Sequence, residues 1–249
     1  MPDYSTWTAT EIISALNHAP QPTVFLEGVE DMAIYREIKK MRPHLPFHWL
    51  ALGGRNRVLE VFARRAEIRH KVAFLVDNDM WLFAPDTAPA EDAALLRTWG
   101  YSIENDLYAA GGYVVDYQLT AAEHANKAQL LRSVSAWFAS EVRKYRTGKK
   151  SELKIQHASL NDPQVVAKGN FILSEAFLQN VDYIEPSDAE LQEITAEQYR
   201  RLRGKFLMQA YFKLFDERQS HNEDKAVKYT PTHLRSQMLG AGLNDANVN

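Results

Sequence analysis

Three acidic residues in the first third of the chain follow runs of apolar residues. Glu27 comes after Thr23–Leu26, and Asp77 and Asp79 come after Lys71–Val76. Magnesium prefers carboxylate oxygens in proteins and completes its coordination with waters and substrate phosphate oxygens. A bound ion of this kind neutralises charge on a phosphate and activates a water at neutral pH. The three residues therefore indicate metal-dependent chemistry on phosphate groups.

The elements that must position these residues are short strands that alternate with helices. Apolar runs at Thr23–Leu26, Phe47–Leu52 and Lys71–Val76 predict strands, and helical spacing predicts helices over 31–42 and 58–66. Unbroken apolar runs that alternate with helices are typical of parallel βαβ units. Ligands of such sheets bind beyond the carboxyl ends of the strands. The sequence thus predicts an α/β fold, a parallel sheet flanked by helices, with the acidic residues at one edge.

A further run at Leu95–Tyr101 predicts a fourth strand, which would deliver Glu104 to the same edge. Downstream, the pattern becomes helical, with main helices expected over 130–145 and 197–215. The expected organisation is a catalytic α/β domain with an N-terminal helix over 1–112, a mainly helical region over 113–239, and a flexible tail over 240–249.

Two segments of the helical region match the capping box, in which Ser or Thr is followed three residues later by Glu or Gln. They are Thr120-x-x-Glu123 and Thr195-x-x-Gln198. Each predicts the beginning of a helix.

Composition narrows the possible chemistry. The 249 residues include no cysteine, which excludes disulfides, thiol nucleophiles and cysteine-ligated zinc. The formal net charge of -3 leaves nucleic-acid binding to local basic patches. No apolar run approaches the roughly 20 residues that span a bilayer, and the N-terminus lacks the pattern of a secretory signal. A cytoplasmic location without membrane contact is expected.

Each candidate also has an ordinary structural interpretation. A single aspartate after a strand, such as Asp77 or Asp79, is commonly a turn or cap residue. Asp31 serves either as the cap of the first long helix or as a carboxylate that supports the metal. Glu104 lies in Ser102-Ile-Glu-Asn105, which equally suits the beginning of a short helix.

The sequence resembles the TOPRIM superfamily at these positions. The pattern of that family is Glu-Gly after the first strand, a later glycine pair, and Asp-x-Asp after a further strand. This chain has Glu27-Gly28, Gly53-Gly54 and Asp77-Asn78-Asp79. More narrowly, residues 101–105 and Arg203-Gly204-Lys205 resemble OLD-like TOPRIM proteins of bacterial anti-phage systems, among them the effector subunits of PARIS-type systems.

The resemblance implies a metal-dependent nuclease that cleaves RNA, with tRNA as one substrate class, or DNA. It assigns Glu27 as general base or metal ligand and Asp77 and Asp79 as metal ligands, with Mg²⁺ or Mn²⁺ as cofactor. Asp31 becomes a second-ion or supporting carboxylate, and Glu104 a further acidic residue of the site. The partners it implies are a nucleic acid and an ATPase sensor subunit, in an anti-phage defence complex, and a homodimer is left open.

Basic residues suggest where a nucleic acid would bind. Arg55 and Arg57 directly follow the glycine pair and are well placed to contact a substrate phosphate, as is Lys205 by the resemblance. Basic clusters over 143–154 and 200–205 include tyrosines, a mixture that suits phosphate contact and base stacking. Both clusters, and Lys205 itself, equally suit solvated helix faces.

Four rival functions share parts of this pattern. Haloacid-dehalogenase-like phosphatases also place Asp-x-Asp after a strand, but they need Thr or Val where this chain has Trp81. Manganese-dependent sugar transferases use Asp-x-Asp as well, although nothing else here indicates a nucleotide-sugar pocket. Zinc bound by His44 and His48 is disfavoured, because Pro46 between them argues against a helix. The remaining rival is a non-catalytic TOPRIM-fold subunit that docks on an ATPase partner.

Overall fold

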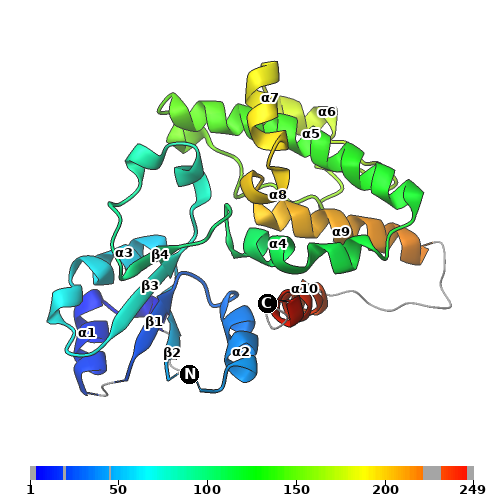
Figure 1. The fold of residues 1–249 in the computed structure, drawn as a ribbon. Coiled ribbons are helices and arrows are strands. Elements are labelled where there is room, and N and C mark those ends of the chain that lie inside the picture. Colours follow the sequence, from blue (N-terminus) through cyan, green and yellow to red (C-terminus); the bar gives the residue numbers. More distant parts are fainter. Residues whose placement is uncertain (1–3, 19–20, 45, 221–230, 246–249) are drawn as a thin grey trace. The chain divides into compact units, whose positions relative to one another are not determined.

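The computed structural model describes residues 4–18, 21–44, 46–220 and 231–245, and the chain divides into two compact units (Figure 1). The first unit comprises Met1–Asn78 and Pro89–Thr98, and the second comprises Asp79–Ala88 and Trp99–Asn249. The domain boundary expected at residue 112 falls inside helix α4 (Ile103–Asp116). Of the tail expected over 240–249, residues 240–245 are helical and 246–249 lie outside the described residues.

Among the described residues of the first unit, four short strands form a parallel sheet in the spatial order β2-β1-β3-β4. All four residues of β1 are buried, as its unbroken apolar run predicts. Because the strands are parallel, their carboxyl ends meet at one edge, and the predicted α/β fold is confirmed. The strands are β1 (Thr23–Leu26), β2 (His48–Ala51), β3 (Val72–Val76) and β4 (Leu95–Arg97).

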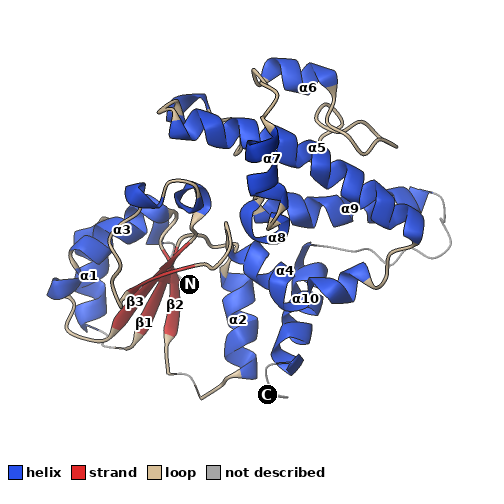
Figure 2. Ribbon diagram, turned by 45° about the horizontal axis from the view of Figure 1, so that its top comes forward, coloured by secondary structure: helices blue, strands red, loops and turns tan. Residues whose placement is uncertain are grey.

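Helices cover both faces of this sheet, with α1 and α3 on one face and α2 on the other (Figure 2). The connections β1-α2-β2 and β2-α3-β3 cross the sheet in opposite directions. Since crossovers between parallel strands are right-handed, opposite directions place the two helices on opposite faces. The helices are α1 (Ala9–His18), α2 (Met32–Met41) and α3 (Arg55–Ala63), with 3-10 helices at Tyr4–Thr6 and Arg65–Glu67.

Aromatic side chains form several contacts within this sheet and between it and its helices. Phe25 and Phe74 occupy paired positions on β1 and β3, and their rings stack with centroids 4.9 Å apart. Phe62 of α3 contacts Phe74 edge to face at 5.3 Å. Tyr35 of α2 lies against Trp49 of β2 at 4.7 Å. Such ring pairs contribute to stability beyond the area they bury.

The second unit is helical and is built around the long helix α5. Its core includes Trp137, Phe138 and Phe206, all fully buried. The helices are α4, α5 (Ala121–Arg146), α6 (Glu175–Asn180), α7 (Asp188–Thr195), α8 (Gln198–Arg201), α9 (Gly204–Ser220) and α10 (Pro231–Asp245). Further 3-10 helices span Asp79–Leu82, Pro85–Thr87 and Lys150–Glu152.

One predicted capping box is confirmed and the other is wrong. Thr120 begins α5, because its hydroxyl accepts the Glu123 N–H and the Glu123 carboxylate accepts the Thr120 N–H at 2.8 Å. Thr195 instead ends α7, and its hydroxyl donates to the Leu191 carbonyl at 3.0 Å. The helix expected over 197–215 is accordingly divided into α8 and α9.

Candidate acidic site at the carboxyl ends of the strands

Glu27 joins three segments of the first unit. It follows β1 directly, and its Oε1 accepts the backbone N–H of Asp77 at 2.9 Å and the Arg55 Nε–H at 3.1 Å. The side chains of Glu27 and Arg55 are 17% and 20% exposed. This carboxylate therefore holds the end of β3 and the beginning of α3 against the end of β1, while part of its surface faces solvent.

The glycine pair explains how Arg55 reaches this position. Gly53 and Gly54 have φ values of 81° and 138°, a region of backbone space that side chains disfavour strongly. The chain can therefore turn sharply after β2 and begin α3 at Arg55. The Glu27 carboxylate thus already orients the Arg55 guanidinium, which is the group predicted to contact a substrate phosphate.

Asp31 occupies the N-cap position of α2, but its side chain caps none of the described backbone N–H groups of that helix. Its carboxylate lies against Gly28 instead, because a Cβ added at Gly28 would stand 3.0 Å from Asp31 Oδ2. The Glu-Gly pair thus leaves room for a second carboxylate beside the turn after β1. Of the two interpretations of Asp31, the side-chain cap is not seen among the described residues, and the role of a supporting carboxylate stays a prediction.

The boundary between the two units falls inside Asp77-x-Asp79. Asn78 belongs to the first unit, where its backbone N–H donates to Thr98 Oγ1 at 3.1 Å and its amide donates to the Thr98 carbonyl. Asp79 belongs to the second unit and has a φ of 46°, and its N–H donates to the Tyr101 carbonyl at 2.7 Å. The residue between the aspartates thus joins the ends of β3 and β4.

Glu104 lies in the second unit, almost fully buried in the first turn of α4. Its carboxylate accepts the Ser102 hydroxyl at 2.8 Å and pairs with Arg235 of α10 at 2.8 Å. Ser102 and Asn105 form the capping box of α4, which confirms that this segment begins a helix. Gly204 lies against these residues, since an added Cβ would stand 2.7 Å from Glu104 Cβ.

The two other candidate phosphate ligands lie on helix surfaces. Arg57 pairs with Glu60 at 2.9 Å, one turn along α3. Lys205 follows Gly204 at the beginning of α9 and is exposed. Ion pairs at the surface contribute little to stability, and the phosphate contact of Arg57 stays a prediction.

In the part of the chain that is described, no group of three or more histidine, aspartate and glutamate side chains lies close enough to hold a metal ion. The predicted ligands are divided, with Glu27, Asp31 and Asp77 in the first unit and Asp79 and Glu104 in the second. Each of these side chains offers the hard carboxylate oxygens that magnesium prefers, and the metal site itself stays a prediction.

The chain matches no protein-family model. No curated protein matches it significantly either. In the described residues, no helix combines the length and apolar character needed to cross a membrane. The resemblance to TOPRIM proteins therefore remains a prediction, which rests on the motifs quoted above.

Sequence reasoning missed two polar residues that position the candidates, and it missed one long-range contact. The residues are Thr98 beside Asn78 and Arg235 beside Glu104, and the contact is that of Asn105, whose amide donates to the Leu202 carbonyl at 2.7 Å. Their partners stand 20, 131 and 97 residues away along the chain. Only a sequence signal that relates positions far apart along the chain would have identified these contacts.

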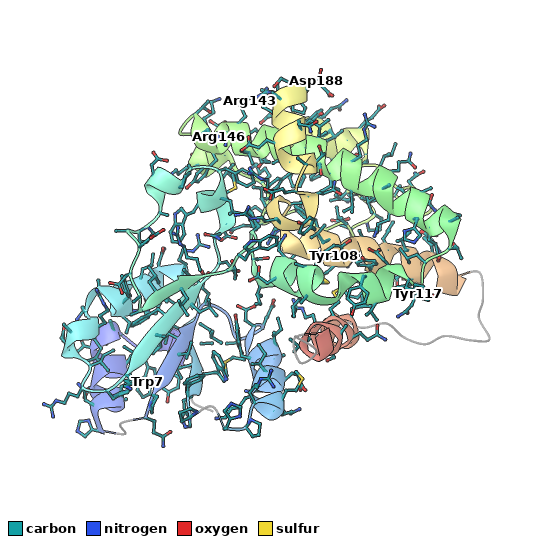
Figure 3. All side chains as sticks on the ribbon, in the orientation of Figure 1. Trp7, Tyr108, Tyr117, Arg143, Arg146 and Asp188 are labelled. Carbon is teal, nitrogen blue, oxygen red and sulfur yellow. The ribbon has the colours of Figure 1, made fainter. Side chains whose placement is uncertain are left out.

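The predicted basic clusters are joined to glutamates in the second unit. Arg143 and Arg146, which Figure 3 labels, pair with Glu190 and Glu193 of α7. Arg146 donates two bonds to Glu193, at 2.7 and 2.8 Å, and Arg201 also donates to Glu193 at 3.2 Å. These three arginines therefore lend the surface less positive charge than the sequence suggests.

This ion-pair group predicts a dependence of stability on pH. Hydrogen bonds from Arg143, and then from Ser187, lower the pKa of Glu190 from its ordinary 4.5 to about 2. A lowered pKa in the folded state stabilises the fold above the ordinary pKa, and this contribution disappears as the pH falls toward about 2. We expect Glu190→Gln to lower the melting temperature near neutral pH, and this difference from the wild type to shrink steadily below pH 4.5. A difference that stays constant through this acid range would contradict the assignment.

Proposed function

We propose that this chain is a cytoplasmic nuclease that hydrolyses phosphodiester bonds of RNA or DNA with Mg²⁺, or Mn²⁺ in its place. The observation that carries the proposal is the Glu27 carboxylate, which holds the Asp77 N–H and the Arg55 guanidinium at the carboxyl ends of parallel strands. This edge is where α/β sheets bind ligands, and it combines acidic groups with a cation. Following the resemblance, we propose that the nuclease acts with an ATPase sensor in anti-phage defence.

The proposed roles are those that the resemblance implies for these residues. Glu27, Asp77 and Asp79, with Asp31 in support, would have to come together to hold magnesium, which would neutralise charge at the scissile phosphate. Glu27 takes the proton of the attacking water, while Arg55 beside it binds a non-bridging phosphate oxygen.

Glu104 has a structural role in this proposal. Its carboxylate is engaged by Arg235 and Ser102, and its membership of the metal-binding set is what the resemblance implies. While it is paired, Glu104 serves to hold α10 on α4.

Incubation of the purified chain with total RNA and with supercoiled plasmid DNA tests the activity directly. We expect fragments or nicks in Mg²⁺ or Mn²⁺ and intact nucleic acid in EDTA, with the candidate ATPase partner added in a parallel series. Intact RNA and DNA in every metal condition, with and without the partner, would overturn the proposal.

One observation favours the docking alternative. Glu27 already accepts two hydrogen bonds, from Asp77 and Arg55, which is also how a carboxylate serves to stabilise a turn. A docking subunit retains its biological effect when Glu27 is replaced by glutamine, whereas a nuclease loses it. A phenotype assay of this variant together with the partner therefore separates the two functions.

A further inference from the structure

Two exposed aromatic side chains of the second unit lie stacked on each other. Trp99 is 46% exposed and Tyr199 is 41% exposed, although both are large enough to be costly at a surface. Their ring centroids are 5.7 Å apart, with planes inclined by 29°. The Arg200 guanidinium lies over the Trp99 ring, 5.0 Å from its centre. We call these three side chains the aromatic platform.

Polar groups of α4 hold the backbone on both sides of the aromatic platform. The Asp106 carboxylate accepts the N–H of Trp99 at 3.1 Å and of Gly100 at 2.8 Å. Asn105, fully buried, donates to the Tyr199 carbonyl at 2.8 Å. One helical turn thus anchors both aromatic residues, although they stand a hundred positions apart in the sequence. The platform is therefore preorganised, and a ligand need not order it.

The arginine of the platform retains access to solvent. Arg200 donates through Nε to the Trp99 carbonyl at 3.3 Å, which keeps its guanidinium beside the ring. Its contacts with the Glu197 carboxylate are long, at 3.4 Å, and its side chain is partly exposed. Positive charge thus accompanies an exposed π surface, which suits a base and its adjoining phosphate.

Chain connectivity places the platform near a candidate catalytic residue. Trp99 stands two residues before Tyr101, whose carbonyl accepts the N–H of Asp79 at 2.7 Å. Trp99, Tyr101 and Asp79 all lie within the second unit. A nucleotide stacked on the platform therefore brings neighbouring phosphates toward Asp79.

We infer that Trp99, Tyr199 and Arg200 bind an unpaired base of a single-stranded nucleic acid. Every base presents a π face, so stacking of this kind is tolerant of sequence, whereas bases inside a duplex are already stacked on each other. The inference rests on the proposed nuclease function and narrows its substrate to unpaired segments, such as loops or single strands. A docked protein would use the same aromatic surface without preferring single strands.

Fluorescence anisotropy with labelled RNA and DNA oligonucleotides of about 12 nucleotides tests binding apart from cleavage, in EDTA. We expect Trp99→Ala to weaken single-strand binding about tenfold and Tyr199→Ala to weaken it by a smaller factor. Trp99→Phe should retain most of the affinity, because phenylalanine still stacks. Tyr117→Ala is the matched control, since Tyr117 is 93% exposed elsewhere in the second unit and should not matter.

Several outcomes overturn the inference. The first is that the wild type binds no single strand. The second is that the Trp99→Ala variant melts like the wild type and binds single strands equally well. The third is that a blunt duplex binds as tightly as a single strand and loses the same affinity in Trp99→Ala. Failure of this inference can be distinguished from failure of the proposed nuclease function. If the protein cleaves nucleic acid but its binding does not depend on Trp99, only the role of the aromatic platform is rejected. Trp99-dependent binding without any metal-dependent cleavage removes only the nuclease function.

Discussion

The Glu27→Gln variant is expected to lose about 10²- to 10⁴-fold in the rate of metal-dependent cleavage while remaining folded. Glutamine has nearly the shape of glutamate, and its carbonyl oxygen can still accept the Asp77 N–H, which Glu27 accepts at 2.9 Å. The amide cannot take a proton from water at neutral pH, and it is a poor ligand for magnesium. Fragment yield over time, measured on the substrate that the wild type cleaves, gives the rate ratio.

A control variant on α2 and a melting experiment with metal ions also test the role of Glu27. Glu37→Gln replaces a partly exposed glutamate on α2, paired with Lys40, and should leave cleavage unchanged. An ion that binds these residues only in the folded state stabilises that state, so Mg²⁺ or Mn²⁺ should raise the melting temperature of the wild type. The rise should be smaller in Glu27→Gln. Equal cleavage by Glu27→Gln and the wild type would exclude Glu27 as a catalytic residue.

The Lys144→Met variant should be the most destabilised of the single substitutions considered. Lys144 and Glu141 form an ion pair on α5 at 2.8 Å, with side chains 8% and 0% exposed. Glu141 also accepts the Lys154 N–H at 2.7 Å, and Lys144 donates to the Val181 carbonyl at 2.6 Å. Removing the lysine leaves a buried carboxylate without its counter-charge, which costs roughly 3–5 kcal/mol in unfolding free energy. Denaturant unfolding measures this loss directly.

A double-mutant cycle tests the reason for that loss. Adding Glu141→Gln to Lys144→Met removes the uncompensated charge and should restore a large part of the stability. Lys149→Met is the matched control, because Lys149 pairs with Glu152 at 3.5 Å while both side chains are exposed. Its cost should stay within roughly 1 kcal/mol. Additive effects of the two buried substitutions would show that the pair is not coupled.

The secondary structure could be predicted best where local sequence decides it. The strand predicted at Thr23–Leu26 agrees with β1 residue for residue, and the helix predicted over 31–42 agrees closely with α2. Unbroken apolar runs and helical spacing report burial directly, so tertiary context has little to change. The capping box at Thr195 was wrong, because the pattern matches short segments and the chain there ends one helix before beginning another.

The candidate site likewise has features that local sequence predicts and features that it does not. Its acidic residues were predicted because each follows a strand or begins a helix, and both are local properties of the sequence. Their partners are not local, since Arg55 lies 28 residues from Glu27 and Arg235 lies 131 residues from Glu104. The basic clusters were predicted as surface charge, but glutamates of α7 engage three of their arginines.

The sequence by itself determined the parallel α/β sheet and the position of Glu27 and Asp77 at its carboxyl edge. The reason is that the spacing of apolar residues and the ends of strands are properties of short segments. Tertiary structure alone decided which carboxylate meets which cation. It turned Glu27 toward Arg55, buried Glu104 against Arg235, and stacked Trp99 on Tyr199. The physical reason is that such contacts join segments far apart in the chain, and their geometry depends on how whole helices pack.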